Sequence, residues 1–341
     1  MVGDGTRRVL WGMIKRLLRR MKKREGVALI TTLMIVALLV TVVIEFNHIA
    51  VAEIDISRNF GDEKKILFTV ISGVNVIGDL LRIERKFSPG VTLTGKWAQS
   101  RTYFEAAGSM LEEERLEGEI TDENGKINVN SLVGEKGGFI EAQKALWERL
   151  LKQTRFGLSA EQVDTIIHGV KDWIDKDDTI TGIYGAEEAF YETRGYPCKN
   201  RSLDHVEELL LIKGITEEIF YGTEDKEGLK PYFTVYGDPE ININTAPVPV
   251  LMALSESMTE SIATDLDTYR RDSANQAQLA EKAWYQTLWP LADPLPEELF
   301  GISSSFFRID VTGTLGESVK KVSAITHVTD TGSRILFWQE M

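Results

Sequence analysis

An uncharged stretch of eighteen residues near the N-terminus, Val27 to Ile44, constrains this chain more than any other feature. As an α-helix it would be about 27 Å long, because each residue adds about 1.5 Å, and that length just crosses the hydrocarbon core of a bilayer. The stretch is apolar on every face, which favours a membrane segment over the buried helix of a soluble core. We therefore expect this part of the chain to cross a membrane.

Charge is divided unevenly between the two sides of this stretch. Residues 1–25 hold nine Lys and Arg side chains against Asp4 and Glu25, a net charge of +7, and the remaining 30 basic and 50 acidic groups give −20. Basic flanks stay in the cytoplasm, so we expect the acidic body on the other side. A body of that charge repels phosphate, and we expect no nucleic-acid partner. The single cysteine, Cys198, excludes an internal disulfide.

The basic leader meets the apolar stretch at a short junction. It ends Lys23-Arg24-Glu25-Gly26, and the apolar residues begin at once with Val27. No A-x-A cleavage site follows, which argues against an ordinary secretory signal peptide. The junction resembles that of the type IV prepilin family, in which a prepilin peptidase cuts after the glycine. The resemblance implies cleavage between Gly26 and Val27. The fifth mature residue, usually glutamate in that family, would be Thr31 here.

Apolar spacing predicts helix first and strands later. Apolar residues recur at intervals of three and four up to Leu81, which extends the helix to about residue 86, with a kink expected at residues 59–62. Residues 101–131 read as strands, with a hairpin at Asn124-Gly125. Three strand-like runs close the chain and predict an antiparallel meander. They are Phe306–Leu315, Val319–Val328 and Ser333–Gln339.

The region between these strands has a helical pattern. Helices are expected at 137–155 and 159–175, and in two pairs at 203–220 and 247–271. The first pair has the spacing of a helix-hairpin-helix, a unit often found on DNA, but its acidic neighbours favour a structural role.

These patterns together predict an α+β fold. A long N-terminal transmembrane, pilin-like helix packs on an antiparallel sheet, into which a large all-α domain of helix-hairpin-helix or SAM-like type is inserted. The predicted parts are a basic prepilin leader (1–26), a transmembrane and N-terminal helix (27–58), the first part of an α/β domain (59–132), the inserted helical domain (133–301) and the last strands of the α/β domain (302–341).

An acidic segment follows the helix predicted to end near residue 175. Its polar residues include Asp175, Asp177, Glu187 and Glu188, with Asn200 further on. Carboxylate and amide oxygens are the ligands that hard cations require. Glycine and glutamate are missing from the sixth and twelfth positions counted from Asp175, so the segment is not an EF-hand. A solvated acidic loop and a cation site both remain open.

No catalytic motif is present. The sequence contains no G-x-S-x-G, P-loop, G-x-G-x-x-G or H-E-x-x-H. We therefore expect a protein that is not an enzyme. A membrane-tethered hydrolase that uses the acidic segment to hold its metal is the alternative among enzymes.

Several segments in one order resemble the type II secretion system protein K family (general secretion pathway protein K, GspK). They are Arg24-Glu25-Gly26, Asp122-Glu123-Asn124-Gly125-Lys126-Ile127-Asn128-Val129-Asn130, Asp172-Trp173-Ile174-Asp175, Gly185-Ala186-Glu187, Tyr191, Asn200, Glu207-Glu208-Leu209 and Ile241-Asn242-Ile243-Asn244-Thr245-Ala246-Pro247. The resemblance implies a minor pseudopilin at the tip of the secretion pseudopilus, which helps to initiate its assembly and the export of folded proteins across the outer membrane. Thr31 agrees with this family, whose fifth mature residue typically is not glutamate.

The resemblance also implies partners, a cofactor and a location. The partners would be the minor pseudopilins I and J, with H and the major pseudopilin G as further candidates, together with prepilin peptidase and the inner membrane. Calcium would bind in the helical domain, at the positions of Asp175, Asp177, Glu187, Glu188 and Asn200. The chain would cross the inner membrane once, with its body in the periplasm, before it joins the pseudopilus tip. A minor pilin of a type IV pilus or DNA-uptake system, with a DNA-binding hairpin, is the alternative.

Overall fold

The computed structural model describes residues 4–88, 90–108, 111, 114–289, 294–316 and 318–341. The chain divides into two compact units, Met1–Lys65 and Ile66–Met341. Helix α1 (Asp4–Phe87) supplies the described part of the first unit and contains the apolar stretch Val27–Ile44. The helix runs without interruption through residues 59–62, and the kink expected there remains a prediction.

A four-stranded antiparallel sheet forms one half of the second unit. Its strands are β1 (Arg115–Asp122), β6 (Phe306–Leu315), β7 (Ser318–Val328) and β8 (Ser333–Glu340), in the spatial order β1-β6-β7-β8. The three C-terminal strands confirm the predicted meander. Strand β1 joins them across a long gap in the sequence, with Ile120 opposite Ile309.

The part of α1 that begins at Ile66 packs against this sheet. Its buried residues recur at helical spacing, as predicted, and form one hydrophobic core with the inward side chains of the four strands. Gly313 of β6 lets the helix approach closely, because a Cβ atom there would lie 2.8 Å from Val70 Cγ2 and 2.9 Å from Ile66 Cγ2. A larger residue at Gly313 would therefore push the helix off the sheet.

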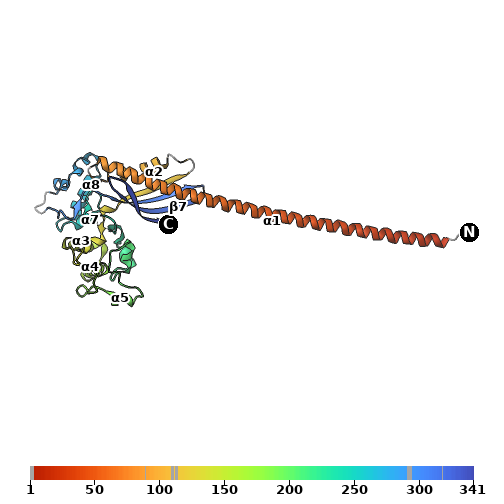
Figure 1. Ribbon diagram of the computed structural model, residues 1–341, viewed down its shortest axis with the longest axis horizontal. Helices are drawn as coiled ribbons and strands as arrows, with labels where there is room; N and C mark the ends of the chain where they lie inside the picture. The colour runs from red at the N-terminus through yellow and green to blue at the C-terminus, as the bar shows by residue number, and fades with distance from the viewer. Residues whose placement is uncertain (1–3, 89, 109–110, 112–113, 290–293, 317) are drawn as a thin grey trace. The chain divides into compact units, whose positions relative to one another are not determined.

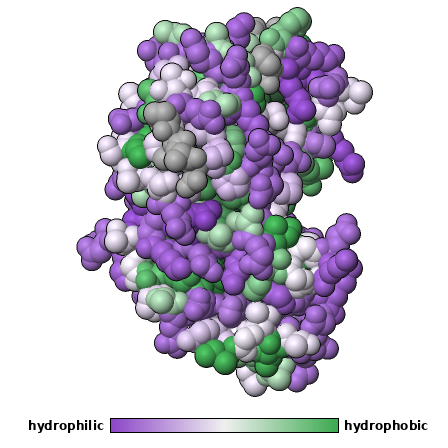
Figure 2. All heavy atoms as spheres, turned by 90° about the vertical axis from the view of Figure 1, so that its left-hand side faces the viewer, coloured by the Kyte–Doolittle hydropathy of each residue, from purple (hydrophilic) through white to green (hydrophobic). Residues whose placement is uncertain are grey.

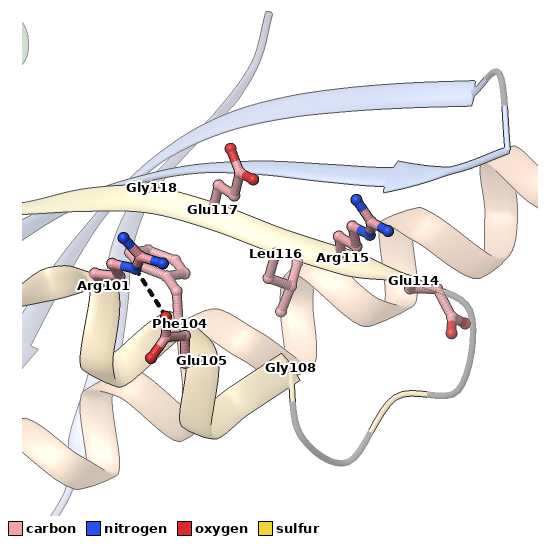
Figure 3. Close-up of a pocket in the computed structure, with 9 residues that line it drawn as sticks. All are labelled: Arg101, Phe104, Glu105, Gly108, Glu114, Arg115, Leu116, Glu117 and Gly118. Atoms are coloured by element: carbon pink, nitrogen blue, oxygen red, sulfur yellow. Dashed lines mark hydrogen bonds and ion pairs between the residues drawn. The ribbon is translucent and has the colours of Figure 1, made fainter.

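A short helix, α2 (Ser100–Gly108), stands where the sequence predicted a strand. The prediction of strands from residue 101 is therefore wrong for its first eight residues. Adjacent Tyr103 and Phe104 are both buried. The Phe104 ring packs under β1, where a Cβ atom on Gly118 would lie 2.5 Å from its Cζ (Figure 3). The Arg101–Glu105 ion pair, four residues apart at 2.8 Å, fits a helix and not a strand.

Residues between β1 and β6 form a second body with its own hydrophobic core. Its helices are α3 (Glu141–Leu151), α4 (Ala160–Ile174), α5 (Glu188–Glu192), α6 (Glu217–Tyr221), α7 (Val248–Ala253) and α8 (Glu260–Arg271), several of them labelled in Figure 1. Two short parallel pairs accompany them: β2 (Ile127–Asn128) with β3 (Phe233–Thr234), and β4 (Ile241–Asn242) with β5 (Phe300–Gly301). The first member of the predicted helical hairpin is a 3₁₀ helix, η5 (Val206–Leu211).

The hairpin predicted at Asn124-Gly125 is wrong, because the chain turns inward there instead of reversing. Asp122 is buried, and its carboxylate accepts hydrogen bonds from the Asn124 N–H (2.9 Å), Asn242 Nδ2 (3.2 Å), Thr245 Oγ1 (2.5 Å) and Ser304 Oγ (2.5 Å). Its partners thus come from both chain ends of the insert and from the motif around Asn242. We call Asp122, Glu123 and their hydrogen-bond partners the junction.

Glu123 completes the junction with ionic contacts. Its side chain is fully buried. One carboxylate oxygen contacts Lys126 Nζ at 2.7 Å and Arg308 Nε at 3.0 Å, and the other accepts from Thr234 Oγ1 at 2.5 Å. Arg308 belongs to β6, so these contacts tie the start of the insert to the sheet. The chain leaves the sheet after Asp122 and returns at Phe306. The predicted boundaries at 132/133 and 301/302 remain predictions.

Candidate functional site

The segment between α4 and α5 is held in one conformation by a buried carboxylate. Helix α4 follows its N-cap, Ser159, and carries Asp172 in its last turn. Asp172 is fully buried. Its two carboxylate oxygens share the N–H of Thr181, each at 3.1 Å, and Oδ2 also accepts from the N–H of Ala186 at 2.8 Å. A Cβ atom on Gly185 would lie 2.1 Å from Asp172 Oδ2, so only glycine fits there. We call residues 175–188 together with Asn200 the acidic loop.

Three of the five predicted cation ligands have oxygens that are buried and lack hydrogen-bond partners. They are Asp175 Oδ1, both carboxylate oxygens of Glu187, and Asn200 Oδ1. The Asp175 and Glu187 side chains belong to residues that are only 2% and 4% exposed. Apart from the weakly polar Cys198 thiol, no donor reaches Glu187. Buried oxygens of this kind cost free energy unless a donor or a cation satisfies them.

The other two predicted ligands are already engaged or exposed. Asp177 is exposed and its Oδ1 accepts from the Thr179 N–H at 2.9 Å. Glu188 Oε2 accepts from the Cys198 N–H at 2.7 Å. Across the residues that the structure describes, no three His, Cys, Asp or Glu side chains are arranged to hold a metal ion. The acidic loop as it stands is therefore not a finished coordination shell.

The electrostatics of the acidic loop disfavour ionised Glu187. Burial, and next the charges of Asp172 and Asp175, raise the pKa of Glu187 to about 7. Burial also raises the pKa of Asp175, although Lys171 Nζ donates to its Oδ2 and opposes that shift. The pKa of exposed Asp177 is lowered, first by its hydrogen bonds to Thr179.

Sequence reasoning did not single out two residues that organise this loop. Asp172 was noted only as part of a motif, yet it fixes the backbone of the loop through Thr181 and Ala186. Asp178 accepts from Asn200 Nδ2 at 3.0 Å and so connects Asn200 to the loop. Asn200 has a φ of +48°, in the left-handed region that asparagine tolerates better than most residues. The positive φ could not be read from the sequence.

The predicted processing and assembly residues lie in α1. Val27 is exposed, and no side chain approaches Gly26 within 4 Å of the place where a Cβ would stand. Thr31 Oγ1 donates to the carbonyl oxygen of Val27 at 2.8 Å, so its hydroxyl is satisfied within its own helix. Within the described residues, the segment from Gly26 to Phe87 is the one helix whose length and composition would allow it to cross a membrane, with a mean hydropathy of 3.0 over its most apolar window.

A hollow between α2 and β1 shows no catalytic constellation. Arg101, Glu105, Arg115 and Glu117 line it, with Phe104 and Leu116 beneath (Figure 3). It contains neither a serine or cysteine nucleophile nor a histidine base among its described residues. On the face shown in Figure 2, hydrophilic residues predominate and apolar residues form small separate patches.

Comparison with known proteins agrees with this architecture. The family model of the type II secretion system (T2SS), protein K, matches residues 125–238. Type II secretion system protein K of Aeromonas hydrophila is 24% identical over 331 residues, which is 92% of each chain. The protein of the same name from Pseudomonas aeruginosa is 29% identical over 242 residues, which is 68% of each.

A solved structure shares the fold. It belongs to the GspK-GspI-GspJ complex from the type 2 secretion system of enterotoxigenic Escherichia coli, with a TM-score of 0.65, 17% identity and coverage of 84% of this chain and 99% of the other. This similarity confirms the α+β prediction. The family is a structural component of the secretion system and not a known family of enzymes. From the family model, the curated relatives and the shared fold together, the chain is similar to type II secretion system protein K along most of its length.

Proposed function

We propose that this chain is a minor pseudopilin and that it occupies the tip of the type II secretion pseudopilus, where it helps to initiate assembly and the export of folded proteins. The observation that carries the proposal is the insert, a helical body with its own core that interrupts the sheet between β1 and β6. A body of this size beside the packing helix would obstruct a subunit added above it. A terminal position removes that conflict.

Thr31 supports the same position. In filaments of this type, a glutamate at the fifth mature position is thought to pair with the N-terminal amine of the next subunit. A subunit with nothing above it needs no such carboxylate. The Thr31 hydroxyl instead bonds to Val27 of its own helix.

The N-terminal segment is proposed to anchor the chain before assembly. Prepilin peptidase would cut between Gly26 and Val27, and the apolar part of α1 would cross the inner membrane once. The basic leader keeps the N-terminus cytoplasmic and leaves the acidic body in the periplasm. The same apolar surface would then pack against neighbouring helices in the filament, where H and the major pseudopilin G are further candidate neighbours.

Pseudopilins I and J are the proposed immediate partners, because the solved structure with the same fold comes from a complex of K, I and J. The test is co-purification of the full chain in detergent with I and J of the same organism, in calcium and in EDTA. A ternary complex supports the tip assignment. No complex in either buffer, combined with salt-sensitive DNA binding by the chain, would favour the pilus or DNA-uptake alternative.

Calcium is the proposed cofactor of the acidic loop. Asp175, Glu187 and Asn200 supply buried oxygens without hydrogen-bond partners, the donor type that calcium requires. Asp177 and Glu188 would join them, each with one carboxylate oxygen already used. The bound ion would offset the repulsion among the carboxylates and fix the loop. A complex with I and J that weakens in EDTA would support this role, and one indifferent to EDTA would remove it while leaving the tip proposal intact.

A further inference from the structure

Strand β8 forms one edge of the sheet. It is the last strand in the order β1-β6-β7-β8 and pairs with β7. Among the residues that the structure describes, no backbone hydrogen bond joins β8 to any strand other than β7. Within the described part of the chain, no strand is therefore paired to its other side.

The register identifies which backbone groups face that side. The Met341 N–H donates to the Lys321 carbonyl at 2.9 Å, which makes these two residues a hydrogen-bonded pair. In an antiparallel ladder, hydrogen-bonded and non-hydrogen-bonded pairs alternate. Trp338, three residues from Met341 and opposite Ala324, is therefore in a non-hydrogen-bonded pair. Its N–H and C=O point away from β7, toward the edge.

Charged residues, Arg334 and Glu340, stand near the two ends of β8, and a register irregularity interrupts its pairing, so only its centre lacks charge. Natural proteins guard exposed edges with charged residues, proline or a covering segment. The centre of β8, Ile335-Leu336-Phe337-Trp338-Gln339, contains no charge and no proline. Leu336 is 42% exposed beside a register irregularity in the pairing with β7. The uncharged, largely apolar centre of the edge is suited to pairing with another chain.

A groove runs beside the edge. It encloses about 830 Å³ and is lined by Phe337, Trp338 and Met341 from the strand side. Leu210, Leu211 and Tyr221 line the opposite side, from η5 and α6. An extended segment paired to β8 would thus find apolar contacts for its side chains as well as backbone partners.

The charges in the groove are already neutralised by the protein itself. Glu207 contacts Lys230 at 3.0 Å, and Glu208 contacts Lys199 at 2.5 Å. The groove therefore offers neither an unpaired cation nor an unpaired anion to a ligand among its carboxylates and lysines. The complementary ligand is an uncharged one.

We propose that β8 and this groove bind an extended, uncharged, apolar segment of another protein, which adds to the sheet as a fifth strand. Main-chain hydrogen bonds to Trp338 would provide affinity. The apolar groove would select side chains on one face of the bound strand. This proposal goes beyond the tip assignment and depends neither on that assignment nor on calcium.

The test uses the full chain in lipid nanodiscs and a fluorescein-labelled probe. The probe is a blocked heptapeptide of alternating valine and threonine. Its counterpart carries N-methyl groups on alternate residues, which remove the donors on one edge of the strand. We expect saturable binding of the first peptide by anisotropy, at least tenfold weaker binding of the second, and slower hydrogen exchange at the Trp338 amide when the first is bound.

Matched variants locate the site. Leu336→Lys places a charge at the edge, and Val319→Lys makes the same change at a 56% exposed position of β7 that does not line the groove. Leu211→Lys tests the opposite wall, so the proposal stays testable if one variant folds poorly. We expect at least tenfold weaker binding for L336K and L211K, unchanged binding for V319K, and unchanged far-UV circular dichroism in all three.

Three results would overturn the proposal. One is absence of saturable binding by the unmethylated peptide, and another is equal binding of the two peptides. The third is a concentration-dependent dimer of the chain that L336K abolishes, since the edge would then serve a second copy and not another protein.

Discussion

The second unit contains two clusters of buried carboxylates, and they differ in whether the protein itself supplies partners for the carboxylate oxygens. In the junction, both oxygens of Asp122 and both of Glu123 accept hydrogen bonds or ion pairs from the protein itself. In the acidic loop, both oxygens of Glu187 and one of Asp175 accept none. The junction is complete as the chain folds. The acidic loop leaves these buried oxygens without a partner from the protein.

Glu123 and Glu187 show the difference most directly, because both are glutamates buried in the same unit. Burial alone would raise the pKa of Glu123, but Lys126 and Arg308 outweigh it and hold that pKa below its ordinary value. At Glu187 the nearest charges are carboxylates, so they add to the effect of burial and its pKa rises to about 7. The comparison teaches that a buried carboxylate is structural where cations of the chain face it, and is a candidate ligand where only other carboxylates do.

Removing Glu123 should have the largest effect of the changes considered. Glu123→Ala leaves Lys126 and Arg308 without their shared carboxylate at the junction, and breaking a buried ion pair typically costs about 3–5 kcal/mol. We expect a loss of that size in the free energy of unfolding, measured by urea denaturation, equal in calcium and in EDTA. Glu224→Ala, at an exposed position, is the control and should change little. A loss that calcium restores would mean that the two clusters are not independent.

Calcium should stabilise the protein through the acidic loop alone. At a free concentration one hundred times its dissociation constant, a ligand that binds only the folded state adds about 2.7 kcal/mol. We expect an increment of that order in the wild type, seen as a higher melting temperature, and its loss in Glu187→Gln. Glu192→Gln makes the same change on an exposed residue nearby and should keep the increment. An increment that survives Glu187→Gln would exclude Glu187 as a ligand.

Asn200 allows ligation to be separated from backbone strain. Glycine tolerates the φ of +48°, whereas alanine does not, so Asn200→Gly removes the amide oxygen and Asn200→Ala adds strain as well. We expect both variants to reduce the calcium increment, and only the alanine variant to lose about 1 kcal/mol of stability relative to the glycine variant in EDTA. Equal stability of the two variants in EDTA would show that the left-handed conformation is not required.

Much of the fold could be read from the sequence, because its signals are periodic and local. The alternation in β6 to β8 predicted those strands almost to the residue, and the apolar spacing in α1 predicted its C-terminal end. The start of α1 was not predicted, because the helix begins at Asp4 and not at Val27. Helix α2 was missed because its two buried aromatic residues, Tyr103 and Phe104, are adjacent and give no clear period. The Asn124-Gly125 hairpin was wrong because Asn124 Oδ1 accepts from the N–H groups of Ser305 and Phe306, 181 and 182 residues away. A contact of that separation overrides local turn preference.

The residues of the acidic loop could be predicted from the sequence, but the contacts of their side chains could not, because those contacts also depend on residues distant in the sequence. Its carboxylates were visible in the sequence, but their states are set by neighbours that the sequence does not place. Glu188 looked equivalent to Glu187, yet only Glu188 has a backbone donor, the Cys198 N–H. Thr31, Gly26 and Val27 rest on the resemblance, and their roles remain predictions.

The smallest expected effect is on the pH dependence of stability, which should distinguish the acidic loop from the junction. The Glu187 pKa is about 7 in the folded protein against an ordinary value of 4.5, so the metal-free folded state binds more protons between those values. Its stability must therefore fall as pH rises from about 4.5 to 7. Asp122, with a pKa of about 6 against 3.8, contributes a fall of the same sign from about 3.8 to 6.

The variant Glu187→Gln isolates the contribution of the acidic loop to this pH dependence of stability. In EDTA, melting temperatures measured from pH 4 to pH 8 should fall less steeply in this variant, and the difference from the wild type should develop between about pH 4.5 and pH 7. Between pH 6 and pH 7, where Asp122 has largely finished titrating, Glu187 should account for most of the fall that remains in the wild type. With calcium the wild-type trend in that interval should weaken or reverse, because the ion binds the deprotonated carboxylate. Parallel curves for the two proteins in EDTA would show that Glu187 is ionised at little cost, and the distinction between a self-sufficient junction and a loop that needs a cation would fail.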